Sequence, residues 1–257
     1  MAHTASPIAD FLTASITEVT EQVISVIPGS RFLRRDGACA AVTGLPAPPF
    51  NGVWSERPDP DMADVAALLD EVADAGALYS LRARPGSDEA LAKLASARGM
   101  TLVGDLTLMA LDSGDDIPAI PEPAGLAIRQ LAPEQTPRAA AVAAAGFGLT
   151  GETFLQAAGP DLLRLASVRC YTGEVDGQPV TTALSVTVGR FTGIFNVATL
   201  PGWRGRGFGT AVIARAVADG LAVGSRWCWL QATPVGLTSY RMAGFQAIEP
   251  LQYWLSV

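Results

Sequence analysis

Helical and strand-like patterns of apolar residues alternate along the chain. Over the first 111 residues they predict a helix at 13–27, then a hairpin at 31–42 that turns at Asp36-Gly37. A short strand containing Asn51 comes next, and the remaining pattern predicts a helix at 61–75, a strand at 78–83, a helix at 89–98 and a strand at 101–111.

The second half of the chain shows a similar order of predicted helices and strands. A strand is predicted at 125–131, and the apolar strand at 191–200 precedes a glycine-rich stretch. The other predicted elements are helices at 133–145, 152–165, 208–220 and 237–243, a hairpin at 168–188, and strands at 226–233 and 246–257.

This similarity predicts an internal duplication. Asn51 precedes Pro85 by 34 positions, and Asn196 precedes Pro234 by 38. The expected domains are residues 1–111 and 124–257, with a linker at 112–123 that mixes acids, glycine and three prolines. The alternative is that any alternation of helices and strands looks self-similar.

Composition narrows the class of protein. The chain has 257 residues, a net charge of −7 and a hydrophobic fraction of 49%, which fits a globular protein. The acidic excess argues against nucleic acid, and no apolar run suits a membrane span. Three widely spaced cysteines favour neither disulfides nor a metal site, so a cytoplasmic location is expected.

One loop carries most of the chemistry. Residues 203–210 read Trp-Arg-Gly-Arg-Gly-Phe-Gly-Thr between a predicted strand and a predicted helix. Glycines allow a close approach of the backbone, and a helix N-terminus offers unpaired N–H groups to a phosphate. The corresponding residues 55–61 of the first half have no glycine, two prolines and three acids, so no cofactor is expected there.

The glycine loop and a later segment resemble the GNAT-type N-acetyltransferases. The matching motifs are Arg204-x-x-Gly207-x-Gly209 and Tyr240-x-x-x-Gly-Phe. The resemblance implies an α+β fold with two GNAT-like domains, the first degenerate. Each would be a mixed, mostly antiparallel sheet flanked by helices, and the later domain would have a splayed central strand. The implied co-substrate is acetyl-CoA, held by Asn196, Val197, Ala198, Thr199, Arg204, Gly205, Arg206, Gly207, Phe208, Gly209 and Thr210.

Candidate catalytic residues follow from the same comparison. Tyr240 would protonate the departing thiolate, with an ordinary packed tyrosine as the alternative. Glu152 is the candidate base, and the favoured alternative is an acid that merely stabilises a helix start. Glu174 is expected to be solvated, and His3, the single histidine, is expected to take no part.

The expected activity is transfer of an acetyl group to an amine of a small molecule or peptide, by a monomer or homodimer without metal, membrane or nucleic acid. The alternative is a non-catalytic acyl-CoA sensor or assembly module, favoured by the absence of a carboxylate in residues 191–200. A dinucleotide fingerprint is disfavoured, because the third glycine is misplaced and no acid closes the next strand.

Overall fold

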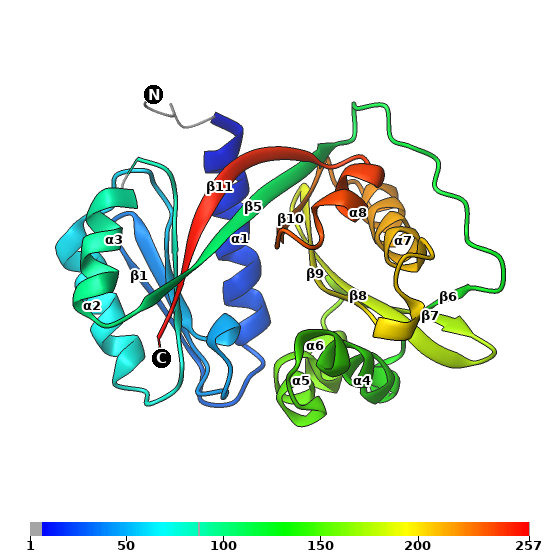
Figure 1. Ribbon diagram of the computed structural model, residues 1–257, viewed down its shortest axis with the longest axis horizontal. Coiled ribbons are helices and arrows are strands. Elements are labelled where there is room, and N and C mark those ends of the chain that lie inside the picture. Colours follow the sequence, from blue (N-terminus) through cyan, green and yellow to red (C-terminus); the bar gives the residue numbers. More distant parts are fainter. Residues whose placement is uncertain (1–6, 87, 257) are drawn as a thin grey trace. The chain divides into compact units, whose positions relative to one another are not determined.

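The computed structural model describes residues 7–86 and 88–256, and the chain forms two compact units. The first unit is Met1–Leu108 with Ala247–Val257, and the second is Met109–Gln246. Each unit is a mixed sheet flanked by helices, as predicted (Figure 1).

The first unit orders its strands β1-β2-β3-β4-β11-β5. Strands β3 and β4 run parallel, whereas β1, β2 and β3, and likewise β4 and β11, are antiparallel neighbours. Its elements are α1 (Pro7–Ile24), β1 (Arg31–Arg35), β2 (Ala38–Val42), η1 (Pro48–Phe50), β3 (Gly52–Ser55), α2 (Met62–Ala73), β4 (Ser80–Ala83), α3 (Asp88–Ala97), β5 (Thr101–Asp112) and β11 (Gln246–Leu255).

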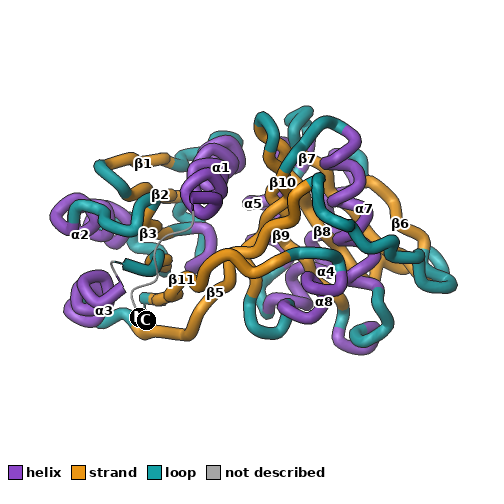
Figure 2. The backbone as a smooth tube through the Cα atoms, turned by 90° about the horizontal axis from the view of Figure 1, so that it is seen from above, coloured by secondary structure: helices purple, strands orange, loops and turns teal. Residues whose placement is uncertain are grey.

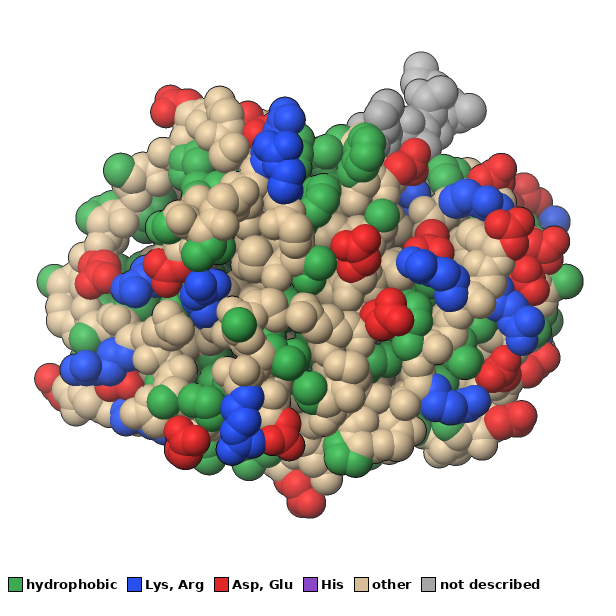
Figure 3. Space-filling model, turned by 180° about the vertical axis from the view of Figure 1, so that it is seen from behind, with side chains coloured by type: hydrophobic (Ala, Val, Ile, Leu, Met, Phe, Trp, Pro, Cys, Tyr) green, Lys and Arg blue, Asp and Glu red, His purple; other side chains and the backbone are tan. Residues whose placement is uncertain are grey.

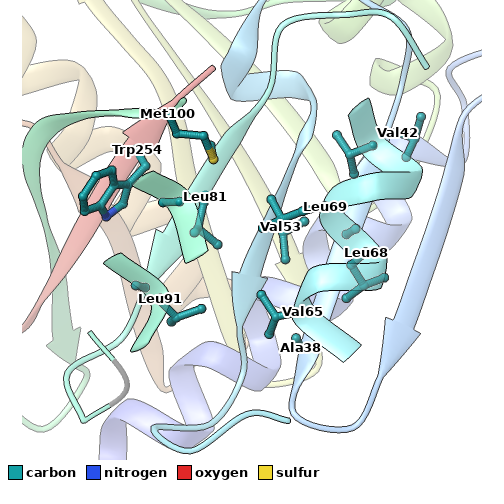
Figure 4. Close-up of a cluster of buried hydrophobic side chains, with 14 residues drawn as sticks. Ala38, Val42, Val53, Val65, Leu68, Leu69, Leu81, Leu91, Met100 and Trp254 are labelled. Carbon is teal, nitrogen blue, oxygen red and sulfur yellow. The ribbon is translucent and has the colours of Figure 1, made fainter. Parts of the chain in front are cut away.

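Helices cover both faces of this sheet. On one face, α2 buries Val65 and Leu68 against Val53 and Leu81 (Figure 4). The alternate residue of β3, Trp54, points to the other face because side chains alternate along a strand. Its indole Nε1 donates a hydrogen bond of 3.2 Å to Thr17 Oγ1 of α1.

The last strand of the chain belongs to the first unit. We predicted residues 246–257 as the final strand of the later domain, but β11 pairs with β4, with Trp254 opposite Leu81. Trp254 of β11 is buried in the hydrophobic core of the first unit. Removing this large apolar side chain from water favours the pairing of β11 with the first unit.

The second unit continues from the end of β5 and orders its strands β5-β10-β9-β8-β7-β6. Figure 2 shows β7, β8 and β9 side by side. Helices α4 to α6 cover one face, and α7 and α8 cover the other (Figure 1). The elements are β6 (Ala127–Gln130), η2 (Pro133–Gln135), α4 (Thr136–Phe147), α5 (Gly151–Ala158), α6 (Pro160–Leu163), β7 (Val168–Val175), β8 (Gln178–Val188), β9 (Phe191–Thr199), η3 (Pro201–Trp203), α7 (Phe208–Ala222), β10 (Trp227–Ala232) and α8 (Leu237–Met242).

Two predictions for this half are corrected. The helix expected at 152–165 is broken into α5 and α6, because Pro160 disfavours a helical conformation at Gly159. The segment 113–126 is irregular as expected, yet it packs on the second unit instead of hanging free. The backbone N–H of Ser113 donates to the Arg226 carbonyl at 2.7 Å, and Pro118 lies against Gly244.

The paired asparagines used to align the two halves occupy different places. Asn51 precedes β3 and is buried, where its Oδ1 accepts from the Thr43 and Gly44 N–H groups and its Nδ2 donates to the Leu45 carbonyl. Asn196 lies inside β9. Asn51 is therefore a structural anchor of a loop, and its spacing to Pro85 is no guide to the site.

A buried arginine connects three elements of the first unit. The side chain of Arg84, which directly follows β4, is 1% exposed. Its Nε lies 2.7 Å from Glu249 Oε1 of β11, and its Nη1 lies 2.8 Å from Asp10 of α1. The same Nη1 donates to the Glu56 carbonyl at 2.6 Å. These contacts satisfy a charge that would be costly to bury alone.

Replacing Glu249 with alanine should destabilise the first unit. Removal of one partner leaves the Arg84 guanidinium buried with only Asp10 as counter-charge, so the free energy of unfolding should fall by about 3 kcal/mol. Urea denaturation measures this change. Glu89→Ala, which breaks the exposed pair with Lys93, is the matched control and should change little. Equal effects of the two variants would contradict the role given to Arg84.

Candidate active site

Strand β9 leaves its neighbour halfway along its length. It pairs in parallel with β10 only from Phe191 to Gly193, opposite residues 227–229. Against β8, Phe195 lies opposite Leu184 and Ala198 opposite Thr182, so three steps of β9 match two of β8. This is a β-bulge, and Asn196 within it has a φ of 51°. The splayed central strand expected from the family resemblance is confirmed.

Two aromatic rings occupy the point of divergence. Phe195 and Trp229 meet edge to face, with ring centroids 5.3 Å apart. A Cβ on Gly193 would lie 2.7 Å from both rings, so only glycine fits at this position. Beyond Gly193 the β10-facing edge of β9 is outside any described ladder, and its backbone groups can pair with an extended ligand.

The glycine loop runs from the end of β9 to α7. Gly205 and Gly207 have φ values of 75° and 78°, which glycine adopts without strain. Gly207 is the N-cap of α7, and no side chain caps this first turn. A Cβ on Gly209 would lie 3.2 Å from Thr199 Oγ1, so the helix start lies directly against the end of β9. Uncapped N–H groups at a 15-residue helix favour an anion.

Both arginines of the loop are held in place. Arg204 Nε donates to the Thr199 carbonyl at 3.0 Å. The Arg206 guanidinium lies 4.8 Å from the centroid of the Trp203 ring, which in turn stacks on Phe208. Both arginine residues remain exposed, so their positive charge is available beside the helix start.

In the first unit, the equivalent helix start is capped and the equivalent strands stay paired. Helix α2 begins after Asp61, whose carboxylate accepts from the N–H groups of Ala63 at 2.8 Å and Asp64 at 3.0 Å. An internal carboxylate thus occupies the position where an anion would bind. Strand β3 also stays paired with β4 from Gly52 to Trp54. The absence of a cofactor site in this half remains an expectation, with a physical reason behind it.

Tyr240 lies on α8, with its ring against Gly236 and edge-on to Phe245 at 6.3 Å. It packs on the apolar cluster that also receives Val197 of the bulge. Burial raises the pKa of the Tyr240 phenol to about 12. The hydroxyl therefore stays protonated at neutral pH, the state that a general acid needs.

Glu152 makes no contact with these residues that the structure describes. It is exposed in the first turn of α5, where Thr150 caps the helix by accepting from the Thr153 N–H. Glu174, expected to be solvated, is instead buried and lies 3.0 Å from Arg138 and 3.4 Å from Arg129. Glu174 therefore forms a structural ion pair with these arginines, contrary to the expectation. His3 lies outside the described residues.

A small pocket opens on the α4 face of the second unit, and sequence reasoning missed it. Asn196 of the bulge reaches it, together with apolar side chains of α4 and α5. The alanine run of α4 was the available signal, because small side chains leave space between a helix and a sheet. The lining is Ala139, Ala140, Ala143, Phe154, Ala158, Cys170, Thr182, Leu184 and Asn196.

Two further features bear on the predicted class. Among the described helices, none combines the length and apolar character required to cross a membrane. Within residues 7–86 and 88–256, no cluster of histidine, cysteine, aspartate or glutamate could hold a metal ion. On the face shown in Figure 3, basic side chains lie among acidic ones without forming a single patch.

Many solved structures resemble the chain, among them the following three. A GCN5-related N-acetyltransferase from Kribbella flavida has a TM-score of 0.69 at 21% identity, over 95% of both chains. A GCN5-related N-acetyltransferase from Sphaerobacter thermophilus has a TM-score of 0.61 at 19% identity, over 92% of this chain and 84% of the other. A tandem GNAT protein from the clavulanic acid biosynthesis pathway has a TM-score of 0.56 at 13% identity, over 93% and 94%.

No curated protein sequence matches the chain. Residues 136–245 match the family described as the acetyltransferase (GNAT) family. This range contains the splayed strand, the glycine loop and the Tyr240-x-x-x-Gly-Phe segment, and the structural likenesses extend over both units. The chain thus has a two-unit GNAT fold, and its residues 136–245 match the acetyltransferase (GNAT) family.

Proposed function

We propose that the protein is an acetyl-CoA-dependent N-acyltransferase whose second unit is catalytic. The observation that carries the proposal is the uncapped start of α7, which lies beside a strand that leaves its neighbour after Gly193. An anion-binding helix start next to a free strand edge suits a ligand with a diphosphate at one end and amides along its length.

The residues of the second unit divide the binding between them. The backbone N–H groups from Arg206 to Thr210 would donate to the diphosphate, with the two loop arginines adding charge. The edge formed by residues 196–199 would pair with the amides of the pantetheine arm. A main-chain N–H near Val197 would donate to the thioester carbonyl oxygen, where negative charge develops as the amine attacks.

Tyr240 supplies the proton for the leaving group. When the amine nitrogen bonds to the acyl carbon and the carbon–sulfur bond breaks, sulfur leaves as a thiolate and the Tyr240 hydroxyl donates its proton to it. Deprotonation of the incoming amine lacks an obvious agent, since neither β9 nor the pocket lining holds a carboxylate or histidine. Glu152 acting through water, or an acceptor that arrives neutral, would serve.

The missing base favours a second candidate, a non-catalytic acyl-CoA sensor or assembly module. Such a sensor would bind acetyl-CoA at the same site as the enzyme but would not transfer the acetyl group. Sustained release of free CoA with any natural amine would exclude it, whereas binding of acetyl-CoA without release would support it. The acceptor would be an amine of a small molecule or a peptide. A monomer or homodimer located in the cytoplasm completes the proposal.

Gly207→Asp should weaken cofactor binding, because it adds a negative charge at the start of α7. An aspartate at this position would place a negative charge beside the first-turn N–H groups of α7, and that charge would repel a phosphate. The Kd for acetyl-CoA should rise by about tenfold or more, as expected for the loss of charge-assisted hydrogen bonds. Isothermal titration calorimetry measures it.

Gly207→Asn is the matched control, because asparagine has a similar size and the same left-handed backbone demand without the charge. Its loss of affinity should be the smaller of the two. Unchanged binding of acetyl-CoA by Gly207→Asp would remove the proposed cofactor site.

Tyr240→Phe should lower kcat roughly a hundredfold and leave the Kd for acetyl-CoA nearly unchanged, because only the proton donor is lost. With the pKa of Tyr240 at about 12, kcat of the natural enzyme should show no decline from this group between about pH 8 and 10. Tyr253→Phe, a phenol of the first unit whose pKa burial also raises, is the control. Equal kcat values for the two variants would leave Tyr240 with a packing role alone.

A further inference from the structure

We infer that residues 113–126 form a strap that positions the two ends of the proposed cofactor site. Pro123 of the strap holds the glycine loop, and Pro118 holds the helix that carries Tyr240. The inference rests on the proposed function, since it concerns the site that would bind acetyl-CoA. Figure 1 shows the strap as an extended green loop between β5 and β6.

The strap reaches the glycine loop through a tight turn. The Leu126 N–H donates to the Pro123 carbonyl at 3.0 Å, and Gly125 between them has a φ of 79°, which suits the third position of a type II turn. Leu126 is buried in the apolar cluster that contains Phe208, the first residue of α7. The turn therefore places Pro123 beside the start of this helix.

Pro123 packs on the N-cap of α7. Its Cγ lies 3.7 Å from the point where a Cβ on Gly207 would stand, which is an ordinary van der Waals distance. Glycine loses more conformational freedom than other residues when it is ordered, and Gly207 has no side chain that could fix its position. A contact from outside the loop lowers the entropy that the loop would lose on binding a phosphate. Pro123 is therefore a positioning residue for the first-turn N–H groups of α7.

At its other end the strap contacts α8, a helix of six residues whose position depends on packing because so short a helix is unstable alone. The Phe245 N–H donates to the Tyr240 carbonyl at 3.0 Å, and Gly244, with a φ of 94°, closes the helix. Pro118 fills the space beside this cap, since a Cβ on Gly244 would lie 2.9 Å from the proline Cδ. Ile117 packs on the same apolar cluster as Tyr240.

The short stretch of chain between the two prolines couples these contacts. From Pro118 to Pro123 the chain makes five residue steps, which span at most about 18 Å. The end of α8 and the start of α7 therefore stay within a limited separation while both contacts hold. A proton donor and a phosphate site that act on the two ends of one cofactor depend on a fixed separation, because small misplacements at the reacting atoms slow the reaction.

The test uses the full chain and measures the Kd for acetyl-CoA by calorimetry. It measures kcat as release of free CoA with the fastest acceptor in a panel of primary amines. Pro123→Gly should raise the Kd about fivefold and leave kcat nearly unchanged, because it frees the glycine loop alone. Pro118→Gly should lower kcat about tenfold at a nearly unchanged Kd, because a misplaced Tyr240 hydroxyl affects the proton transfer alone.

Pro121→Gly is the matched control, because it makes the same change in chain entropy at an exposed proline of the same strap. It should change neither parameter. The division of the effects between Kd and kcat separates positioning from a general loss of stability, which would affect both. The melting temperature of each unliganded variant is measured as well. If a glycine variant unfolds, Pro123→Ala or Pro118→Ala replaces it, since alanine also lacks the ring atoms that make the contact.

Equal Kd values for Pro123→Gly and Pro121→Gly would overturn the inference and leave the proposed function standing. This comparison decides even if no amine is turned over. An unchanged kcat in Pro118→Gly, where turnover is measured, would overturn the inference too. If the natural protein fails to bind acetyl-CoA, the proposed function fails and the inference fails with it.

Discussion

The separation of β9 from β10 after Gly193 is the constraint on which the candidate site depends. A sheet normally pairs every interior backbone group, because an unpaired buried N–H or C=O is costly. Here the ladder stops, with the rings of Phe195 and Trp229 packed where a side chain on Gly193 would stand. The bulge at Asn196 then shifts the rest of the strand. Under the proposed function, an extended ligand completes the hydrogen bonding at this edge.

The two units differ in whether the corresponding strands separate. In the first unit β3 and β4 stay paired, and Asp61 caps the following helix from within the chain. In the second unit the strands diverge and the glycine at position 207 leaves the helix start uncapped. Both differences concern hydrogen bonding. In the first unit the backbone groups of the strand and of the helix start have partners within the chain, whereas in the second unit the strand edge and the helix start are left open. The first unit has the same kind of sheet and helices, and its helix start is capped by a carboxylate of its own chain.

Local patterns predicted much of this arrangement, and long-range pairing escaped them. The order of helices and strands, the glycine loop and the Tyr240 segment follow from residues close together in sequence, where periodicity and turn chemistry act. The position of β11 depends instead on Trp254 and on Glu249, which meets Arg84 across 165 positions. The burial of Glu174 depends on arginines of two other elements. The break before Pro160 was a local signal and could have been predicted.

The proposed chemistry is asymmetric, because Tyr240 would act as the acid whereas β9 holds no carboxylate or histidine that could act as the base. A phenol with a pKa of about 12 holds its proton over the whole range in which amines titrate. An alkyl amine, with a reference pKa of about 10.4, is almost entirely protonated at neutral pH, whereas an α-amino group at about 7.7–8.0 is partly neutral. Under the proposed function, an acceptor whose amine has a low pKa would arrive neutral and would need no base in the site. The absence of a carboxylate or histidine in β9 therefore favours acceptors of that kind over alkyl amines of high pKa.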